Sequence, residues 1–338
     1  MHIGIVCYQF GNLNRGGAEV QTDNTVAALN KLDGVSTELI TYNTTDLKKF
    51  DLIHFFKSMS DYEFLSRDLK DKGIPYVVST VYFPTHYHRD MWKARIMHYT
   101  PVLSKLSYMR FIYDLWNNSS CICPNTDEEE LYLKRIGVTA PSVIIPNGLD
   151  IERLSVADKQ AFLSKFQFLQ DKSFVLNVAR IEPRKNQKKL VEACMKLDLP
   201  VVIIGRIGDS DYYRQIQELK YDKLYCLGAI HEPEILYGAF QAARTFALPS
   251  TMETPGIAAM EAAYFNIPVA ITQFGGTKYY FNDTVDYVDW RSTQSIINGI
   301  NQSWNRTNVQ TKDLMKQYTW DNIALKYKEL YQRIIDNK

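Results

Sequence analysis

The fold of this chain is decided by the stretch Ser250-Thr251-Met252-Glu253-Thr254-Pro255-Gly256-Ile257-Ala258-Ala259-Met260-Glu261. Thr254 is suited to cap a helix, Pro255 to lie in its first turn, and Asn266 to end it. Gly256 places no side chain over the start of that helix. The stretch therefore predicts a helix whose first backbone N–H groups are open to an anion.

Two glutamates accompany this helix start. Glu253 is predicted in the loop that faces the anion, and Glu261 about two turns inside the helix. A bound anion beside one carboxylate, with a second carboxylate deeper in, indicates a ligand that has a phosphate and several hydroxyls, such as a sugar nucleotide. A surface helix with two solvated glutamates is the alternative, and this stretch alone leaves it open.

The composition fits a globular protein of two domains. The 338 residues suggest two domains of ordinary size, and an apolar content of 46% is enough for substantial cores. The 39 basic residues nearly balance the 38 acidic ones, which argues against a nucleic-acid binder. The five cysteines are odd in number, scattered and without a Cys-x-x-Cys pair, so buried thiols in a reducing compartment are the simplest interpretation.

Expected strands alternate with expected helices, which predicts parallel sheets with helices on both faces. Since the first strand is expected to begin at residue 2, no signal peptide is expected, and no apolar run approaches the roughly 20 residues that span a bilayer. The expected strands are 2–8, 36–42, 51–56, 75–82, 119–123, 173–179, 200–205, 223–228, 244–248 and 268–272, with a strand and turn over 142–150. The expected helices are 18–31, 61–72, one from 127, and 320–336.

A short basic loop follows the expected strand 173–179. Arg180 lies at the carboxyl end of that strand, Lys185 lies near the start of the next helix, and Asn186 is suited to cap this helix. Two fixed cations at such a position would neutralise a diphosphate and stabilise it as a leaving group. A solvated basic face is the alternative, because further basic residues lie nearby: Arg184, Lys188 and Lys189.

These features together resemble the family 4 retaining glycosyltransferases of the GT-B fold. The resemblance is carried by the Glu-x7-Glu spacing, by the Arg180 loop, by Gly-Gly-Ala-Glu at 16–19 and by Pro-Asn-Gly-Leu-Asp at 146–150. It implies an α/β protein of two facing Rossmann-like domains with a cleft between them. Residues 1–150 would bind the acceptor, 151–319 would bind the nucleotide sugar, and 320–338 would cross back to the first domain.

The resemblance also implies roles for individual residues. Arg180 and Lys185 would hold the diphosphate, Glu253 the donor-sugar hydroxyls, and Glu261 the ribose hydroxyls. Gly16 and Gly17 would face the donor across the cleft, although a plain turn is the alternative for them. The remaining donor-binding positions are the helix start (Thr254, Gly256, Ile257) and the loop that holds the base (Ile230, His231), where His231 is equally compatible with an exposed loop histidine.

The sequence departs from the family pattern in the first domain. Many members carry a histidine at the end of the fourth strand, and Tyr82 stands at that place here. His86 is then the candidate for a catalytic polar group near the acceptor, whereas His54, inside an apolar strand, is interpreted as a core histidine. In the second domain, Pro255 stands where many members have Phe, and the run 275–278 lacks the glutamate that often follows its two glycines.

The function implied by the resemblance is transfer of a sugar from a UDP- or GDP-sugar to a glycan or lipid-linked acceptor with retention of configuration, in the synthesis of cell-surface polysaccharide or glycoconjugate. No further cofactor is expected, and metal independence is expected because no histidine or cysteine cluster has metal-ligand spacing. The alternatives are a sugar-nucleotide epimerase or hydrolase on a similar fold, and an inactive GT-B partner subunit. A cytoplasmic location, peripheral on the inner face of the membrane, would suit a lipid-linked acceptor.

The segment 84–118 interrupts the alternation of strands and helices. Its basic residues (Arg89, Lys93, Arg95, Lys105, Arg110) outnumber its acidic ones (Asp90, Asp114), so the net charge is 5 − 2 = +3. Large apolar residues, from Met91 to Trp116, are interleaved with this charge. Such a segment can lie in an anionic membrane surface. The alternative is a pair of helices buried against the sheet of the acceptor domain.

Overall fold

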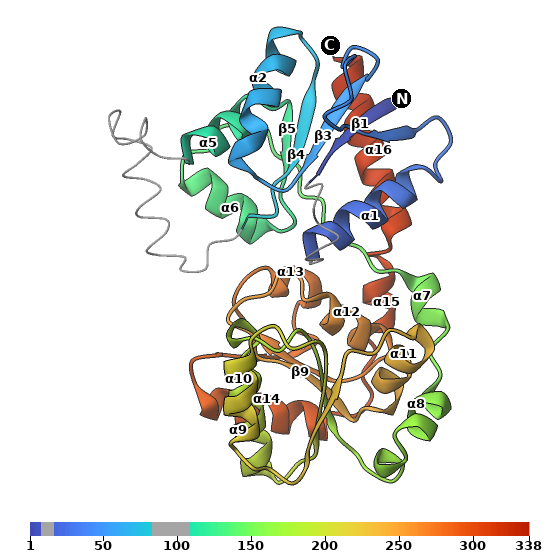
Figure 1. Cartoon of the computed structure of the whole chain (residues 1–338), viewed down its shortest axis with the longest axis vertical. Helices are drawn as coiled ribbons and strands as arrows, with labels where there is room; N and C mark the ends of the chain where they lie inside the picture. Colours follow the sequence, from blue (N-terminus) through green and yellow to red (C-terminus); the bar gives the residue numbers. More distant parts are fainter. Residues whose placement is uncertain (8–16, 83–108, 338) are drawn as a thin grey trace. The chain divides into compact units, whose positions relative to one another are not determined.

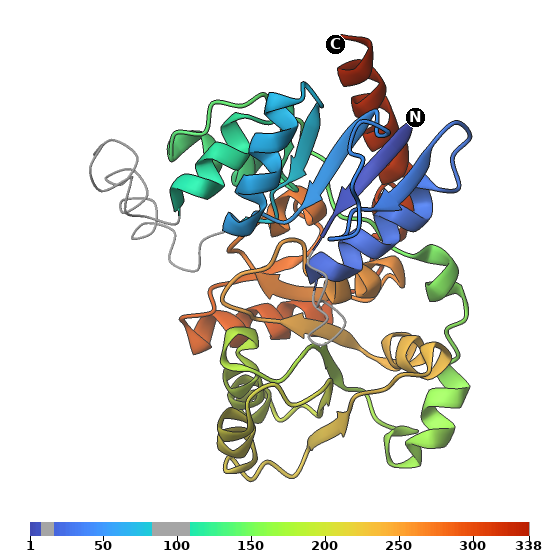
Figure 2. The same ribbon diagram turned by 45° about the horizontal axis from the view of Figure 1, so that its top comes forward.

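The computed structural model describes residues 1–7, 17–82 and 109–337, and it divides the chain into two compact units. The first unit comprises Met1–Gly148 with Tyr318–Lys338, and the second comprises Leu149–Gln317. Each unit is a parallel α/β unit with its own sheet (Figures 1 and 2). The observed boundaries between the two units, after Gly148 and after Gln317, lie two residues before the boundaries of 150 and 319 that the sequence suggests.

The first unit is built on a five-stranded parallel sheet in the order β2-β1-β3-β4-β5. Its strands are β1 (His2–Val6), β2 (Ser36–Leu39), β3 (Leu52–Phe56), β4 (Tyr76–Ser79) and β5 (Cys121–Cys123). Helices α1 (Gly17–Leu29) and α16 (Trp320–Asp336) cover one face, and α2 (Glu63–Asp71), α5 (Met109–Asn117) and α6 (Asp127–Arg135) cover the other (Figure 1). Each of these strands begins within two residues of its predicted start.

The prediction of a strand within 142–150 is wrong, because the structure has no regular strand between β5 and α7 (Ile151–Ser155). Ser142 forms an isolated bridge to Ile122 of β5, and Leu149 is a second isolated bridge residue. Backbone hydrogen bonds also run from the Val143 N–H to the Ile122 carbonyl and from the Ile145 N–H to the Pro124 carbonyl. Pro146 has no N–H group with which to extend a ladder, which explains why no regular strand forms.

Helix α16 packs on the sheet of the first unit. Trp320, Ile323, Tyr327 and Tyr331 share a core with strand residues of β1, β3 and β4. His54 of β3 lies in this core, fully buried, with Nδ1 2.6 Å from the Tyr331 hydroxyl and Nε2 2.8 Å from Ser79 Oγ. Burial lowers the pKa of His54 to about 3, so the ring is neutral. The interpretation of His54 as a satisfied core histidine is confirmed.

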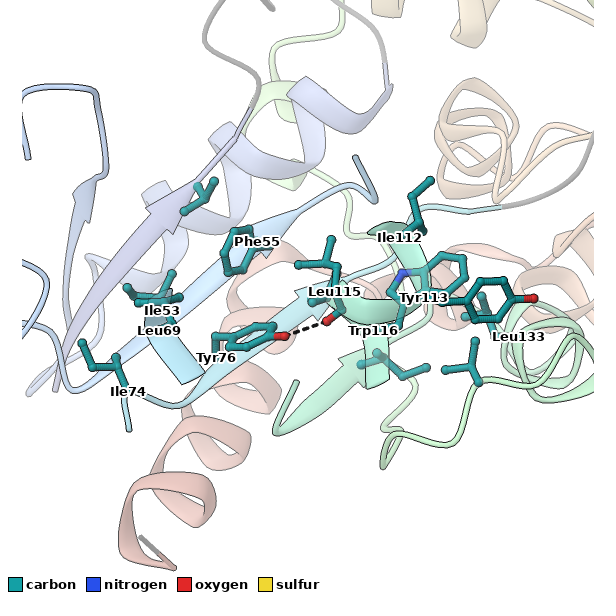
Figure 3. Packing of buried hydrophobic residues seen from close by; sticks show 14 of the residues in the cluster. Ile53, Phe55, Leu69, Ile74, Tyr76, Ile112, Tyr113, Leu115, Trp116 and Leu133 are labelled. Carbon is teal, nitrogen blue, oxygen red and sulfur yellow. Dashed lines mark hydrogen bonds between the residues drawn. The ribbon is translucent and has the colours of Figure 1, made fainter. Parts of the chain in front are cut away.

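The other face of the sheet buries the described part of the segment 84–118. Ile112, Tyr113, Leu115 and Trp116 of α5 pack against β3, β4 and α6 (Figure 3), and the Tyr76 hydroxyl donates to the Leu115 carbonyl at 2.9 Å. For residues 109–118 the buried-helix alternative is therefore correct and the membrane-facing interpretation is wrong. Residues 84–108 lie outside the described residues.

The second unit has a six-stranded parallel sheet in the order β11-β10-β9-β6-β7-β8. Its strands are β6 (Val175–Val178), β7 (Val201–Ile204), β8 (Leu224–Gly228), β9 (Thr245–Leu248), β10 (Val269–Thr272) and β11 (Asp286–Val288), the last of which was not predicted. Its helices are α7 (Ile151–Ser155), α8 (Lys159–Lys165), α9 (Gln187–Leu197), α10 (Ser210–Gln217), α11 (Pro233–Ala242), α12 (Ile257–Tyr264), α13 (Thr277–Phe281), α14 (Thr293–Asn305) and α15 (Lys312–Lys316).

Candidate functional site

Several residues singled out in the second half of the sequence lie at one edge of the second sheet. Arg180 follows β6, Ile230 follows β8, and Glu253 follows β9. Because all six strands are parallel, their carboxyl ends lie at the same edge, and ligands of such sheets bind there. The candidate site of the second unit is therefore built from the loops at this edge.

Lys185 and Glu253 form a buried ion pair at this edge. The Lys185 Nζ and Glu253 Oε1 atoms are 2.5 Å apart, and the side chains are 14% and 7% exposed. Burial opposes ionisation of Glu253, but the positive charges of Lys185 and Arg184 outweigh it and hold the pKa of this carboxyl below its usual value. In this structure the charge of Lys185, predicted as a fixed cation for a diphosphate, is balanced by Glu253.

Arg180 is held beside the loop that follows β7. Its guanidinium pairs with Glu182 across 3.5 Å. A Cβ atom at Gly208 would lie 2.6 Å from Arg180 Cδ and 2.7 Å from Arg180 Cγ, so only a glycine leaves room for this arginine stem. Gly208 could not be identified from the sequence, because the loops that follow β6 and β7 lie next to each other only in the fold.

Asn186 lies at the N-cap position of α9, as predicted, but its side chain makes no capping hydrogen bond. Its side-chain amide donates to the carbonyls of Pro249, at 3.0 Å, and Trp290, at 3.1 Å. The prediction of a cap is wrong because the backbone of Asn186 is left-handed, with φ 59°, and directs the side chain elsewhere. The residue instead ties the basic loop to the end of β9.

Helix α12 begins later than the sequence predicted. Its first residue is Ile257 and its N-cap residue is Gly256, with φ 82°, so no described side chain caps it. Thr254 and Pro255, joined by a cis peptide bond, precede the helix, so the predictions of a Thr254 cap and of Pro255 in the first turn are wrong. The first N–H groups, from Ile257 onward, are left without a side-chain cap.

Glu253 and Glu261 can be placed relative to the two ends of α12. A Cβ atom at Gly256 would lie 3.4 Å from the Glu253 side chain, so Glu253 lies against the helix start. Asn266 follows the helix in the left-handed conformation, with φ 56°, which confirms its predicted role at the end. Glu261 is the fifth helical residue, about one turn inside rather than two.

Glu261 lies in a separate polar cluster with residues of α7 and α11. The Tyr237 hydroxyl is 3.4 Å from Glu261 Oε1, and the Arg153 guanidinium lies over the Tyr237 ring, 5.9 Å from its centre. Burial raises the pKa of Glu261 to about 7, while the charge of Arg153 opposes this shift. The carboxyl is therefore poised between its charged and neutral forms near neutral pH.

The loop after β10 supports Glu253 through its backbone. Gly275 forms a bridge with Glu253, and the Gly276 N–H donates to the Glu253 carbonyl at 2.9 Å. A Cβ atom at Gly275 would lie 2.3 Å from that carbonyl oxygen, and Gly275 has φ 94°. The Gly-Gly pair, whose following glutamate is missing here, thus fixes the position of Glu253.

The positions of the remaining predicted residues neither support nor oppose their predicted roles. Ile230 is buried, and His231 is exposed with its N–H 3.2 Å from a Glu232 carboxylate oxygen. Gly17 begins α1, whereas Gly16 and His86 lie outside the described residues. Tyr82 follows β4, as predicted, but its hydroxyl points at the Met109 sulfur, 3.6 Å away.

No group of three or more His, Cys, Asp or Glu side chains that could hold a metal occurs among the described residues. One Asp-x-Asp run, a pair of carboxylates of the type that binds divalent cations, occurs in the sequence at Asp209-Ser210-Asp211. In the structure Asp209 caps α10 by accepting from the Tyr212 N–H at 2.9 Å, and Asp211 pairs with Arg214 at 2.9 Å. Across the described ranges, every helix is too short or too polar to cross a bilayer.

Comparison with known proteins gives a match to one family and to several relatives. Residues 158–317 match the family of glycosyl transferases group 1. The chain is 25% identical over 280 residues to the UDP-Gal:alpha-D-GlcNAc-diphosphoundecaprenol alpha-1,3-galactosyltransferase of Escherichia coli, covering 77% of this chain and 67% of the relative. It is 24% identical over 399 aligned positions to the D-inositol 3-phosphate glycosyltransferase of Corynebacterium urealyticum, covering 96% and 92%.

Solved structures share the fold over the whole chain. Sucrose-phosphate synthase from Thermosynechococcus elongatus superposes with a TM-score of 0.77 at 17% identity and covers 100% of both chains. Anabaena Alr3699/HepE in complex with UDP and glucose superposes with a TM-score of 0.74 at 17% identity, covering 98% of this chain and 100% of the other.

Proposed function

We propose that the chain is a glycosyltransferase of the GT-B fold, because residues 158–317 match the family of glycosyl transferases group 1 and solved structures share the fold over the whole chain. A sugar would pass from a UDP- or GDP-sugar to a glycan or lipid-linked acceptor with retention of configuration. The product would belong to a cell-surface polysaccharide or glycoconjugate. The donor would be the substrate, and no further cofactor or metal would take part.

In the proposed reaction, the bond between the anomeric carbon and a diphosphate oxygen breaks, and the acceptor oxygen bonds to the same face of that carbon. The departing diphosphate takes the proton of the acceptor hydroxyl, so the protein supplies no nucleophile. Arg180, Lys185 and the N–H groups at the start of α12 would stabilise the charge that develops on the diphosphate. Glu253 would accept from the sugar hydroxyls, and Glu261 from those of the ribose.

The observation that carries this proposal is the ion pair of Lys185 and Glu253 against the uncapped start of α12. A buried pair of opposite charges beside open N–H groups is suited to a ligand that carries both an anion and hydroxyls. A diphosphate would compete with Glu253 for the Lys185 ammonium, and the carboxylate that it displaced would then be free to accept hydrogen bonds from the sugar.

The donor and acceptor to test first come from the relatives. The Escherichia coli relative is named for UDP-Gal and for GlcNAc linked through a diphosphate to a lipid, and the Anabaena relative was solved with UDP. The base would contact the loop of Ile230 and His231, and Gly16 and Gly17 would contact the donor from the first unit. A lipid-linked acceptor would bring the enzyme to the inner face of the membrane.

The experiment has two stages. In the first, thermal unfolding is followed with UDP and with GDP, because a ligand of the native state alone raises the unfolding temperature. In the second, UDP-galactose is offered with a synthetic GlcNAc-diphospholipid, and the anomeric configuration of the product is read by NMR.

Each result has a distinct meaning. Transfer with the α configuration of the donor supports the proposal. Turnover of the donor without acceptor would instead favour an epimerase or hydrolase, and nucleotide binding without any turnover would favour an inactive partner subunit. If neither nucleotide stabilised the protein, the assignment of the donor site would fall.

A further inference from the structure

The fourth strand of the first unit ends in a strained turn. Val81, two residues after β4, has φ 39°, which is a conformation that β-branched residues avoid. Such conformations persist only where the surroundings hold them, and they gather at functional sites. The turn lies at the carboxyl edge of the first sheet, where a parallel α/β sheet binds its ligand.

One carboxylate holds both residues that flank Val81. Glu129 Oε1 accepts from Thr80 Oγ1 at 2.5 Å and from the Tyr82 N–H at 2.8 Å. Its other oxygen accepts from the Asn125 N–H at 2.8 Å. Glu129 therefore joins the exit of β4 to the exit of β5 through a single side chain that is only 1% exposed.

The position of Glu129 within α6 explains how it reaches these partners. It is the third residue of α6, and its own N–H donates to Thr126 Oγ1 at 3.2 Å. A glutamate at this position usually turns back to the N–H of the capping residue. Here it reaches Asn125 and the β4 exit instead, so its placement serves the turn rather than the helix.

Stability alone does not account for a buried charge at this point. All three partners of Glu129 are hydrogen-bond donors, which suits an ionised carboxylate, yet no cation among the described residues pairs with it. Burial raises the pKa of Glu129, and the hydrogen bonds from Thr80, Tyr82 and Asn125 oppose this shift. Burying a carboxyl group is unfavourable unless it is hydrogen-bonded, so the three donors that converge on Glu129 at the ligand edge indicate a positioning role.

The other side of the turn is fixed by aromatic packing. The Tyr82 ring lies edge-on to Trp116, with 5.1 Å between ring centres, and stacks on Tyr132 at 6.2 Å. Because Trp116 and Tyr132 belong to the buried core, the ring anchors Tyr82 while Glu129 anchors its backbone. Together these contacts give the exit of β4 one defined conformation.

We propose that Glu129 is a positioning residue for the acceptor: its carboxylate holds the turn Thr80–Tyr82 in the conformation that acceptor binding requires. This inference rests on the proposed function, because it treats the first unit as the acceptor side. Glu129 itself touches neither substrate in this proposal; it acts through the backbone of Tyr82 and the hydroxyl of Thr80.

The test compares two variants of the full chain with a matched control, using UDP-galactose and the synthetic GlcNAc-diphospholipid. Glu129→Gln keeps the size of the side chain but turns an amide NH2 group toward a donor. Thr80→Val removes one hydrogen bond and leaves the charge in place. The control is Glu130→Gln, in the same helix, since the half-buried Glu130 pairs with Lys134 at 2.8 Å and accepts from Ser142 Oγ, partners that both lie outside the turn Thr80–Tyr82.

We expect kcat/KM for the acceptor to fall roughly 100-fold in Glu129→Gln, the effect of a displacement of about 1 Å, while the donor KM changes less than about twofold. Thr80→Val should lower kcat/KM for the acceptor about 10-fold, and Thr80→Ser should keep the wild-type value of kcat/KM. Hydrogen exchange of the Tyr82 amide should be faster in Glu129→Gln and unchanged in Glu130→Gln.

Unchanged acceptor kinetics in both Glu129→Gln and Thr80→Val would overturn the proposal, as would an equal loss of donor affinity, acceptor affinity and unfolding temperature. A wild-type chain that binds UDP but transfers no sugar would overturn the proposed function instead. In that case faster exchange of the Tyr82 amide in Glu129→Gln would still show that Glu129 holds the turn, and unchanged exchange would show that it does not.

Discussion

The Lys185 ammonium lies 2.5 Å from the Glu253 carboxylate, although the two residues are 68 positions apart in the sequence. Each of the two side chains has a role in the proposed reaction, one toward the diphosphate and the other toward the donor sugar. Without donor they neutralise each other in a largely buried site. The consequence is that catalysis and stability are coupled at this pair.

Lys185→Ala should therefore affect both activity and folding. Loss of one preorganised charge donor should slow transfer about 100- to 1000-fold. Because Glu253 would be left buried without its partner, the free energy of unfolding should fall by about 3–5 kcal/mol. The measurements are initial rates and chemical denaturation. The double variant Lys185→Ala/Glu253→Gln should recover much of the stability and none of the activity; a single variant as stable as the wild type would contradict the coupling.

Gly208→Ala should lower activity through Arg180. A methyl group at position 208 would meet the arginine stem at 2.6 Å and displace it, so kcat should fall about 10-fold or more. Arg180→Ala alone should slow transfer about 100-fold, with little change in stability because the Arg180 side chain is partly exposed and its pair with Glu182 is long, at 3.5 Å. In the Arg180→Ala background, Gly208→Ala should have no further effect on kcat. Additive losses in the double variant would show that Gly208 acts in some other way.

Glu261 should give donor binding a pH dependence near neutrality. Its pKa is about 7 without ligand, and only the ionised carboxylate accepts hydrogen bonds with both oxygens, so donor affinity should rise as the pH rises through 7. Titration calorimetry with UDP from pH 6 to 8 would show this, and Glu261→Gln should flatten the profile. Glu234→Gln, an exposed change on α11, is the matched control.

The same pKa shift predicts how the stability of the ligand-free protein changes with pH. Since the folded pKa of Glu261 is raised above the unfolded value of 4.5, its contribution to stability is present below 4.5 and is lost as the pH rises to about 7. The wild type should therefore lose more stability over this range than Glu261→Gln. Parallel stability curves for the two proteins would contradict the shift.

Transfer should persist in excess chelator. The proposed reaction uses Arg180, Lys185 and the start of α12 in place of a metal, and each aspartate of the Asp209-Ser210-Asp211 run has a structural partner. Asp211→Ala should leave transfer unchanged. Asp209→Ala should cost about 1 kcal/mol of stability through the lost cap of α10, again without a change in metal requirement. Loss of activity in chelator that manganese or magnesium restores would refute metal independence.

A membrane contact is testable through the basic residues of 84–108. With Arg110 set aside, because it faces Asp114 on α5 at 3.8 Å, the remaining four are Arg89, Lys93, Arg95 and Lys105. Co-sedimentation with anionic vesicles should weaken with salt and weaken further in Lys93→Glu/Lys105→Glu, because each basic residue near an anionic surface contributes about 1 kcal/mol. Absence of binding to anionic vesicles at low salt would remove the membrane contact and leave the transferase assignment intact.

The sequence by itself determined the alternation of strands and helices, the position of α16 and the end of α12 at Asn266. These features follow from local rules: buried parallel strands are continuous apolar runs, and a left-handed residue ends a helix. The strand β11 was missed because it is only three residues long, Asp286–Val288, and two of its three residues are not aliphatic. The residues of the donor site could likewise be named from motifs in the segments that follow predicted strands, such as Arg180 after 173–179 and the Glu-x7-Glu spacing after 244–248.

Only the tertiary structure decided which partner each polar side chain takes. Thr254 and Asn186 had suitable residue types for caps, but the backbone at Gly256 and at Asn186 is left-handed, so neither caps its helix. Lys185 pairs with Glu253, and Glu129 with the exit of β4, because parallel strands bring distant loops to one edge of a sheet. Residue type and local propensity fix where a hydrogen-bonding group lies along the chain, whereas its partner depends on which segments the fold places within about 3 Å.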